Sequence, residues 1–580
     1  MNRGLADLVS AKFRGRLDLD SVSNGCPRTL IGVQAPVRPE RCWSAEPRCM
    51  AAGIRSTSFV RRVQVSIMAT AKTSQSHPLQ IQPVVIRDGP GVIGLTFCPG
   101  KKHEGLYSGT WDRDLRTDLA AIQAFGAKAL VTLMETAELD GVGVPVSMLA
   151  SLAKEFGLEW HHLPIEDVQA PDERFEDLWA YSGVRLRSAL ARGEKIVVHC
   201  RGGLGRTGTV AGRLLVEFLD EPDTAIRKTR AARRGSIETG SQKSYVENCR
   251  SVASARVPRS REERVVACLL GGAIGDAFGY EVEFQRLHEI RQRFGPDGIK
   301  APVLHHDRLI VSDDTQMTMF TLEGLLGSRD LSSIRQGYLD WLETQRFGTG
   351  SAGKGGAGWL VHQPEMRARR APGNTCLSAL GAGGQGTMSR PINDSKGCGG
   401  AMRVVPIGLT GPAGDAGEAF RLAAEAAALT HGHPSGYLSA GVVASIVRLL
   451  ADGVRLGAAI EQSCGHLVAY PGHEETLAAV NGAVALASGG SQHHPEAVET
   501  LGGGWVGEEA LAIALYSVLS AGSFVEALSI ATNHSGDSDS TASIAGQFWG
   551  AMSGLEGIPH DWVASLDILM PLLHLTRQFT

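Results

Sequence analysis

At 580 residues the chain is too long for a single hydrophobic core, so we expect two or three domains. Hydrophobic residues make up 43% of the chain, charged residues 20%, and the formal net charge is -4. This composition fits a soluble globular protein; it contains no basic stripe for nucleic acid and no apolar run of the roughly 18 residues that cross a membrane. The 10 cysteines form no CxxC pair, which argues against a disulfide framework or a zinc cluster and favours a reducing, cytoplasmic location.

The N-terminal segment differs in composition from the rest of the chain. Residues 26–72 contain many arginines but only two acidic residues, Glu40 and Glu46. Such a bias is typical of a transit peptide, but also of a disordered leader or of sequence upstream of a start at Met68. We therefore assign residues 1–80 to a leader and leave them out of the predicted domains.

The stretch VVHCRGGLGRTGT (residues 197–209) predicts a loop between a strand and a helix. Its glycines let successive backbone N–H groups face inward and form a nest for an anion at the start of the helix. That field is expected to lower the pKa of Cys200 and make its thiolate a nucleophile. Arg206 can bind two oxygens of a phosphate, and Thr207 can hydrogen-bond the leaving thiolate. The glycines expected to line the nest are Gly202, Gly203 and Gly205.

This stretch carries the HCx5R signature and resembles the active-site loop of cysteine-dependent phosphatases. Upstream, WHHLPIEDVQAPD resembles the general-acid loop of that superfamily, which implies Asp167 as the acid, with Asp172 as the rival. Residues 97–135 are similar to the start of the kinase-associated phosphatase subgroup, which is of dual-specificity type. The resemblance implies an α/β domain over residues 81–252, with a central sheet flanked by helices, that dephosphorylates phosphotyrosine or phosphoserine/threonine in proteins.

The composition changes again after this region. Residues 250–264, RSVASARVPRSREER, are polar and arginine-rich and predict a solvated connection, within which we place a linker over residues 253–261. From residue 262 to 580 alanine and glycine dominate, and the periodic stretches have helical spacing. We expect this half to be all-α.

Acidic residues gather at several predicted helix ends in this half. Ser, Thr and Asp are good N-caps, and a helix dipole favours carboxylates in its first turn, so any single group can be explained by capping. Several groups of paired acids are harder to explain in that way, because adjacent carboxylates repel unless a cation screens them. Carboxylate and hydroxyl ligands without cysteine suit Mg²⁺ or Mn²⁺ rather than zinc. The groups are Asp276, Glu281 and Glu283; Ser312, Asp313, Asp314 and Thr315; and Asp537, Asp539 and Ser540.

The motifs GDAFGYEVE, SDDTQMT, SKGCGGAMRVVPIGL, LTHGHPSGY, GGGWVGEEALAIALY and NHSGDSDSTASIAG resemble, in order, those of ADP-ribosylglycohydrolases. The resemblance implies an all-helical domain that binds two Mg²⁺ ions, or Mn²⁺, at the base of an ADP-ribose cleft. Glu283 matches a gating or catalytic acid of some members, and the glycines of residues 349–358 and 397–402 are expected to approach the diphosphate. The implied metal ligands are Ser312, Asp313, Asp314, Asp537, Asp539 and Ser540; the implied substrate-binding residues are Gly399, Gly400, Met402, His431 and Tyr437.

Together these patterns predict a multidomain, bifunctional hydrolase. One site would remove ADP-ribose from modified protein side chains, and the other would remove phosphate from a phosphoprotein. The expected partners are an ADP-ribosylated protein or an ADP-ribose derivative and a phosphoprotein, with no nucleic acid and no membrane. Two alternatives stay open: one domain is a non-catalytic recognition module, or both sites act in turn on a small phosphorylated ADP-ribose derivative.

Overall fold

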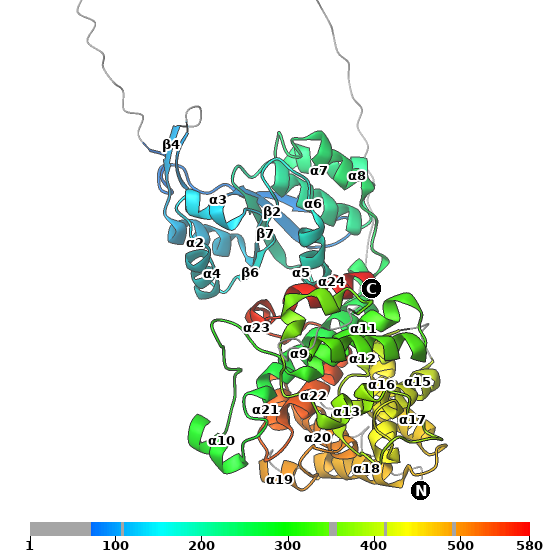
Figure 1. Ribbon diagram of the computed structural model, residues 1–580. Coiled ribbons are helices and arrows are strands. Elements are labelled where there is room, and N and C mark those ends of the chain that lie inside the picture. Colours follow the sequence, from blue (N-terminus) through cyan, green and yellow to red (C-terminus); the bar gives the residue numbers. More distant parts are fainter. Residues whose placement is uncertain (1–70, 106–108, 347–355, 411–414, 490–494) are drawn as a thin grey trace, which may run out of the picture.

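The computed structural model describes residues 71–105, 109–346, 356–410, 415–489 and 495–580. An α/β domain precedes a helical domain along the chain, and the two lie against each other (Figure 1). The α/β domain contains a mixed five-stranded sheet of order β1-β2-β7-β5-β6, in which only the β1 edge is antiparallel to its neighbour, and a separate β3-β4 hairpin. The strands are β1 (Gln82–Val85), β2 (Val92–Phe97), β3 (Lys102–Gly105), β4 (Gly109–Asp112), β5 (Ala127–Thr132), β6 (Glu159–His162) and β7 (Lys195–Cys200).

The central strand β7 lies between two parallel neighbours and is buried along most of its length, which explains its run of β-branched residues. Its pairing with β2 places Phe97 opposite Cys200, so the thiol lies at the carboxyl edge of the sheet. Ligand sites of open α/β sheets lie at this edge. The helices of the domain are α2 (Leu115–Phe125), α3 (Thr136–Gly141), α4 (Val146–Glu155), α5 (Glu173–Ala191), α6 (Gly205–Glu217), α7 (Pro222–Ala232) and α8 (Gly240–Asn248).

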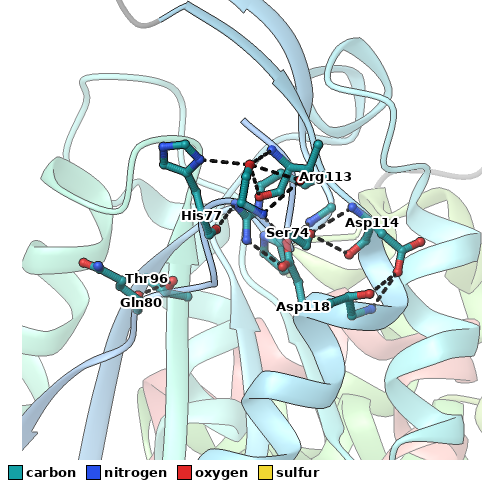
Figure 2. Close-up of polar contacts among 12 residues, drawn as sticks. Ser74, His77, Gln80, Thr96, Arg113, Asp114 and Asp118 are labelled. Carbon is teal, nitrogen blue, oxygen red and sulfur yellow. Dashed lines mark hydrogen bonds and ion pairs between the residues drawn. The ribbon is translucent and has the colours of Figure 1, made fainter. Parts of the chain in front are cut away.

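The described part of the expected leader, residues 71–80, packs against the α/β domain (Figure 2). The backbone N–H of Asp114 donates to the Ser74 hydroxyl at 3.0 Å, and Thr96 Oγ1 donates to the carbonyl of Gln80 at 2.9 Å. Leu79 is buried in the domain core. The α/β domain therefore starts about ten residues before the expected boundary at residue 81.

A buried ion pair holds this segment in place. Arg113 Nε and Nη2 donate to the two carboxylate oxygens of Asp118 at 2.7 Å each, and both side chains are almost fully buried. Arg113 Nη1 also donates to the carbonyl of His77 at 2.7 Å (Figure 2). Asp118 in turn accepts from the Gly100 N–H, so no charged atom of the pair depends on water. Removing one partner of such a pair typically costs about 3–5 kcal/mol.

The second domain is helical throughout its described residues, as expected, and one large apolar core runs through it. Short 3₁₀ turns are η2 (Leu360–His362), η3 (Pro364–Arg367) and η4 (Cys398–Gly400). Its helices are α9 (Arg261–Tyr280), α10 (Leu287–Phe294), α11 (Asp313–Gly327), α12 (Leu331–Thr344), α13 (Asn374–Gly381), α14 (Val405–Leu409), α15 (Ala416–Ala428), α16 (Pro434–Ala451), α17 (Leu456–Leu467), α18 (Glu474–Ser488), α19 (Pro495–Glu499), α20 (Gly507–Ser520), α21 (Phe524–Thr532), α22 (Ser538–Ser553), α23 (His560–Ser565) and α24 (Leu569–Phe579).

Helices α9 and α22 approach so closely that glycines line their contact. A Cβ on Gly279 would lie 2.1 Å from the Ser538 carbonyl oxygen, and one on Gly271 would lie 2.5 Å from the carbonyl oxygen of Gly546. Both distances are far below van der Waals contact, so only glycine allows this packing. The close contact brings the end of α9 beside the start of α22.

Helix α16 is apolar and long enough to cross a membrane by length and composition alone. It contains 18 residues of mean hydropathy 1.3, but 94% of them are buried inside the domain. Helix α16 packs against helices α15, α17, α20 and α22. Its burial is typical of a central core helix.

The two domains share an interface built on helix α5 (Figure 1). Tyr181 and Val184 of α5 are buried in the apolar core of the helical domain. The Tyr181 hydroxyl donates to Nδ1 of His560 at 2.8 Å, because the other ring nitrogen of His560 donates to the Trp160 carbonyl. Arg577 Nε donates to Asp177 at 2.7 Å. The domains therefore dock through apolar and polar contacts together.

The connection between the domains is not the solvated linker that its composition predicts. Residues 253–256 form a 3₁₀ turn, η1 (Ala253–Arg256), and Ala255 is buried in the core of the first domain. Glu262, at the start of α9, accepts from Arg187 of α5 at 2.7 Å. Some arginines of this segment also bond to the adjoining domains, since Arg256 donates to the carbonyl of Arg87 and Arg264 to the carbonyl of Ala551.

Candidate active sites

The loop after β7 curls around the thiol of Cys200, which is buried. The backbone N–H of Gly203 points inward and donates to Cys200 Sγ at 3.2 Å. Gly203 has φ +74°, a backbone conformation that favours glycine. A Cβ there would also lie 2.3 Å from the Thr96 carbonyl oxygen, so a side chain would clash. Gly202 has open space around its Cα, and its carbonyl accepts from Arg233 Nη2 at 3.0 Å. The Gly203 N–H thus has the inward orientation that a nest requires, and the use of the loop as an anion site stays a prediction.

Arg206, in the first turn of α6, is 2% exposed and is held rigidly. Its guanidinium donates to both carboxylate oxygens of Glu138, at 2.6 Å and 2.8 Å. It also donates to the carbonyl of Ile165, in the stretch that carries the expected general acid. These contacts fix the plane of the guanidinium at a constant orientation. Sequence reasoning missed Glu138, which is 68 residues from its partner and has no motif of its own.

The two candidates for the general acid have different surroundings. Asp167 lies 2.8 Å from Arg206 Nη2, and its side chain is 61% exposed. Asp172 is the N-cap of α5, where its carboxylate accepts from the backbone N–H of Phe175 at 2.9 Å. Asp167 therefore lies beside Arg206 with a largely exposed side chain, whereas Asp172 caps a helix end.

Thr207 and His199 complete the surroundings of the loop. The Thr207 hydroxyl is buried, and within the described residues it has no hydrogen-bond partner. His199 is hydrogen-bonded to Thr132 Oγ1 at 2.7 Å, and burial lowers the pKa of His199 to about 3, so its ring is neutral. Gly205 donates its N–H to Glu238 at 2.7 Å, a contact that sequence reasoning also missed.

In the helical domain the acidic groups that lie far apart in sequence come together. Ligand oxygens of Glu283, Asp537 and Asp539 all lie within 4.8 Å of one another. Burial first, and then the charges of Asp276 and Asp313, raise the pKa of Asp314 well above its ordinary value. The clusters at the ends of α9, α11 and α22 thus form one site.

Helix ends position these carboxylates. Ser312 is the N-cap of α11, and its hydroxyl accepts from the N–H of Asp314 at 3.2 Å. Asp537 is the N-cap of α22 and accepts from the N–H of Ser540. Asp276 of α9 accepts from the N–H groups of Ser312 and Thr315 and from the Thr315 hydroxyl, so it joins α9 to the start of α11. Capping and clustering are therefore both correct descriptions of the same residues.

Several carboxylate oxygens of this site are buried without a partner. Among the described residues, Glu283 Oε2, Asp313 Oδ2 and Asp314 Oδ2 have no hydrogen-bond partner. Burial and then the charges of Asp537 and Asp313 raise the pKa of Glu283 to about 9. A divalent cation is the group that such unpaired oxygens fit, because it would supply the charge that they lack. The residues present therefore suit Mg²⁺ or Mn²⁺.

Cysteine and methionine sulfur also face this site. The Cys398 thiol donates to Asp537 Oδ2 at 2.7 Å, and the Ser540 hydroxyl lies 3.6 Å from Cys398 Sγ and 3.8 Å from Met402 Sδ. The loop that carries Cys398 is thereby fixed beside the acids. Our sequence reasoning treated this loop through its glycines and did not single out the thiol.

The remaining expected substrate residues surround the same loop. Gly399 and Gly400 are buried, and a Cβ on Gly399 would press on the ring of His431. His431 is hydrogen-bonded to Thr430, and burial lowers the pKa of His431 to about 3. Its neutral ring packs against the loop that carries Gly399. Tyr437 lies in the first turns of α16 and is largely buried.

The other glycine-rich loop, residues 349–358, lies mostly outside the described residues. Two of its glycines are described, and the N–H of Gly358 donates to Asp340 at 2.9 Å. That donor is therefore already engaged within the protein and not available to a diphosphate.

Comparisons with known proteins match each domain to a family. The family model of ADP-ribosylglycohydrolase matches residues 258–579, and a model described as "Polymorphic toxin system, DSP-PTPase phosphatase" matches residues 109–218. The chain is 30% identical over 166 residues to "Cyclin-dependent kinase inhibitor 3" of Rattus norvegicus, which covers 28% of this chain and 74% of that protein.

Two further similarities cover one domain each. The chain is 24% identical over 322 residues to "ADP-ribosyl-[dinitrogen reductase] glycohydrolase" of Rhodospirillum rubrum, which covers 53% of this chain and 92% of that protein. A crystal structure of kinase associated phosphatase matches with 27% identity and a TM-score of 0.26, covering 29% of this chain and 92% of that one. The chain therefore belongs to the ADP-ribosylglycohydrolase family and carries, ahead of that domain, a cysteine phosphatase domain similar to kinase-associated phosphatase.

Proposed function

We propose that this chain is a hydrolase with two active sites. The helical domain releases ADP-ribose from a modified protein side chain, and the α/β domain removes phosphate from a phosphoprotein. The observation that carries the first activity is the convergence of buried, unpaired carboxylate oxygens of Glu283, Asp313 and Asp314. The second rests on a buried thiol that faces an inward N–H and an arginine held by two carboxylate oxygens.

The glycohydrolase site would hold its cations through one group of side chains. When bound, Mg²⁺ or Mn²⁺ supplies positive charge that polarises ribose hydroxyls and a water molecule. The chain's own part is to orient the sugar and to move protons. The bond between ribose C1″ and the acceptor breaks, the water oxygen joins C1″, and the acceptor leaves with a proton that passes through a carboxylate of the site. The residues that would hold the ions are Ser312, Asp313, Asp314, Asp537, Asp539 and Ser540.

Removal of the metal tests this activity. Treatment with EDTA should abolish the release of ADP-ribose from ADP-ribosylated protein, and added Mg²⁺ or Mn²⁺ should restore it. Asp539→Asn should fold normally by circular dichroism but fail to recover. Phosphatase activity of the same samples is the control, and it should be unchanged because a thiolate and an arginine need no metal. Hydrolysis that persists in EDTA would contradict the proposal.

The phosphatase site supports a two-step transfer. The Cys200 thiolate attacks phosphorus, the bond to the leaving oxygen breaks, and Asp167 gives that oxygen its proton. Water then hydrolyses the S–P bond and releases inorganic phosphate and the thiolate. Arg206 and the inward N–H groups bind the phosphoryl oxygens throughout. Cys200→Ser should abolish turnover of an aryl phosphate while leaving the binding of inorganic phosphate intact, as measured by calorimetry; full turnover in this variant would overturn the mechanism.

A further inference from the structure

A second group of side chains of the kind that bind metal ions lies at the interface between the two domains. Glu159 and His161 belong to β6 of the α/β domain, and His560 begins α23 of the helical domain. Each residue offers one ligand atom, a carboxylate oxygen or a ring nitrogen, and these three atoms all lie within 4.8 Å of one another. Neither of the two proposed reactions uses these residues.

The strand β6 places two of the ligands on one face. Successive side chains of a strand point to opposite faces, so Glu159 and His161, two residues apart, share a face. His162 lies on the other face, where its Nε2 is hydrogen-bonded to the Met134 carbonyl at 2.8 Å. The ring centroids of His161 and His560 are 4.4 Å apart, so the ligand-bearing face of β6 meets the helical domain directly.

The outer nitrogen of each histidine ring is already held by an oxygen atom. His560 Nε2 donates to the Trp160 carbonyl at 2.7 Å, so Nδ1 of this ring carries a lone pair, which accepts from the Tyr181 hydroxyl at 2.8 Å. His161 Nδ1 lies 3.0 Å from Ser182 Oγ. Histidines that bind metals use their second nitrogen in this way, because that hydrogen bond fixes the tautomer and the orientation of the ring.

Glu159 adds a carboxylate with one oxygen to spare. Its Oε1 accepts from His161 Nε2 at 2.8 Å and from Arg185 Nε, whereas its Oε2 makes no hydrogen bond to the described residues. One oxygen can therefore keep Arg185 while the other binds an ion. The Glu159 side chain is 25% exposed and lines a cavity of about 310 Å³ between the domains, with four glutamates and three basic residues in its lining. A cation can reach the group through this cavity.

We propose that Glu159, His161 and His560 bind a divalent transition-metal ion, with Zn²⁺ the best match, that links the two domains. Two imidazoles and a carboxylate are a donor set that zinc accepts in four-coordinate sites, and the fourth position is open to water or to the Tyr181 hydroxyl. The ion takes the lone pair of His161 Nε2, and the ring proton then lies on Nδ1, where the Ser182 hydroxyl accepts it. The set contains no cysteine, so the lack of CxxC pairs does not bear on it.

An ion at this position would bind only the docked chain, because its ligands come from both domains. Binding to the native state alone stabilises a protein in proportion to the logarithm of the ion concentration. Strand β6 ends at His162, directly before the stretch that carries Asp167, the expected general acid of the phosphatase. The ion would therefore fasten the helical domain to the strand that leads into that stretch.

Titration with Co²⁺ tests the proposal. The full-length chain is stripped of metal and held in excess Mg²⁺, a hard ion that prefers oxygen ligands. Four-coordinate Co²⁺ with nitrogen ligands absorbs visible light strongly and six-coordinate Co²⁺ with oxygen ligands weakly, so absorbance distinguishes this site from the acids of the helical domain. The wild type and Asp539→Asn should both show the strong signal, and Zn²⁺ should remove it. His560→Ala should weaken Co²⁺ binding more than about 100-fold, and Ser182→Ala, which removes an outer partner, about tenfold.

His574→Ala is the matched control. His574 also lies at the domain interface, with Nδ1 3.2 Å from Asp177 of α5, but it is outside the group, so this variant should bind Co²⁺ as the wild type does. A loss equal to that of His560→Ala would mean that a loosened interface explains the effect, and the proposal would fail. It would also fail if the wild type gave no strong signal, or if the signal vanished in Asp539→Asn and persisted in His560→Ala. Should His560→Ala not fold, the Ser182→Ala titration decides.

Discussion

Glu138 holds the guanidinium of Arg206 through both of its carboxylate oxygens, at 2.6 Å and 2.8 Å. The two residues belong to different helices, α3 and α6, and meet behind the thiol loop. Arg206 would have to bind a phosphate with a fixed geometry, and the two hydrogen bonds to Glu138 hold its guanidinium in one orientation. The relationship makes Glu138 a positioning residue for the phosphatase reaction.

Glu138→Gln keeps the shape of the side chain but removes its charge and one acceptor oxygen. We expect kcat/KM for an aryl phosphate to fall about tenfold, because charge-assisted hydrogen bonds contribute about 1.5–3 kcal/mol each and some of that is lost. Inorganic phosphate should also inhibit the variant more weakly. Glu135→Gln, which removes an exposed ion pair with Arg174, is the matched control and should retain full activity.

The assignment of the general acid predicts two different kinds of defect. Asp167→Ala should slow turnover mainly for substrates with poor leaving groups, because these need the proton most. Asp172→Ala should leave that dependence unchanged but should lower stability by about 1 kcal/mol through loss of the α5 N-cap. Rates on a series of aryl phosphates and thermal melts separate the two. A leaving-group dependence that appears in Asp172→Ala instead would reverse the assignment.

The metal site predicts a pH dependence of stability. Without metal, the pKa of Glu283 is about 9 in the folded chain, above its ordinary value of 4.5, so the folded state holds a proton that the unfolded state releases. That contribution is fully present below about pH 4.5 and is lost as pH rises towards about 9, by up to about 1.4 kcal/mol per pH unit. Metal replaces the proton, so the rise in melting temperature on adding Mg²⁺ should be larger at about pH 8.5 than at about pH 6.

Glu283→Gln is the control for this effect. It removes the titrating group, so the melting temperature of the metal-free chain should depend less on pH than that of the wild type. An increment with Mg²⁺ that is independent of pH in the wild type would show that no buried carboxylate of the site loses a proton on binding.

The docked interface predicts that the domains unfold together. Val184 is 4% exposed, so Val184→Asp would bury an unpaired carboxylate between the domains at a cost of more than about 2 kcal/mol. We expect calorimetry to show one transition for the wild type and two for the variant. Val257→Asp, at a site that is 55% exposed, is the matched control and should keep a single transition. Two separate transitions in the wild type would mean that the interface does not couple the domains.

The two halves differed in how far the sequence could predict them. Motifs around Cys200 and around the acids at helix ends predicted the fold classes and the local elements, because glycine spacing and helical periodicity are local signals. Glu138 and Asp276 escaped prediction as positioning residues, since their roles depend on contacts with residues far away in the sequence. The connection near Ala255 was wrongly predicted as solvated for the same reason: composition cannot show that polar residues have partners in another domain.

Helix α9 limits how these two domains can be exchanged in evolution or by design. Its first turn contacts α5 of the phosphatase domain through Glu262, and its glycines lock it against α22, whose start carries Asp537 and Asp539. A recombination that replaced the phosphatase domain would remove Arg187, the partner of Glu262, and expose the apolar face that Tyr181 and Val184 now cover. The incoming domain would need to bring a matching helix. Exchange of one domain therefore requires a compensating change in the surface of the other.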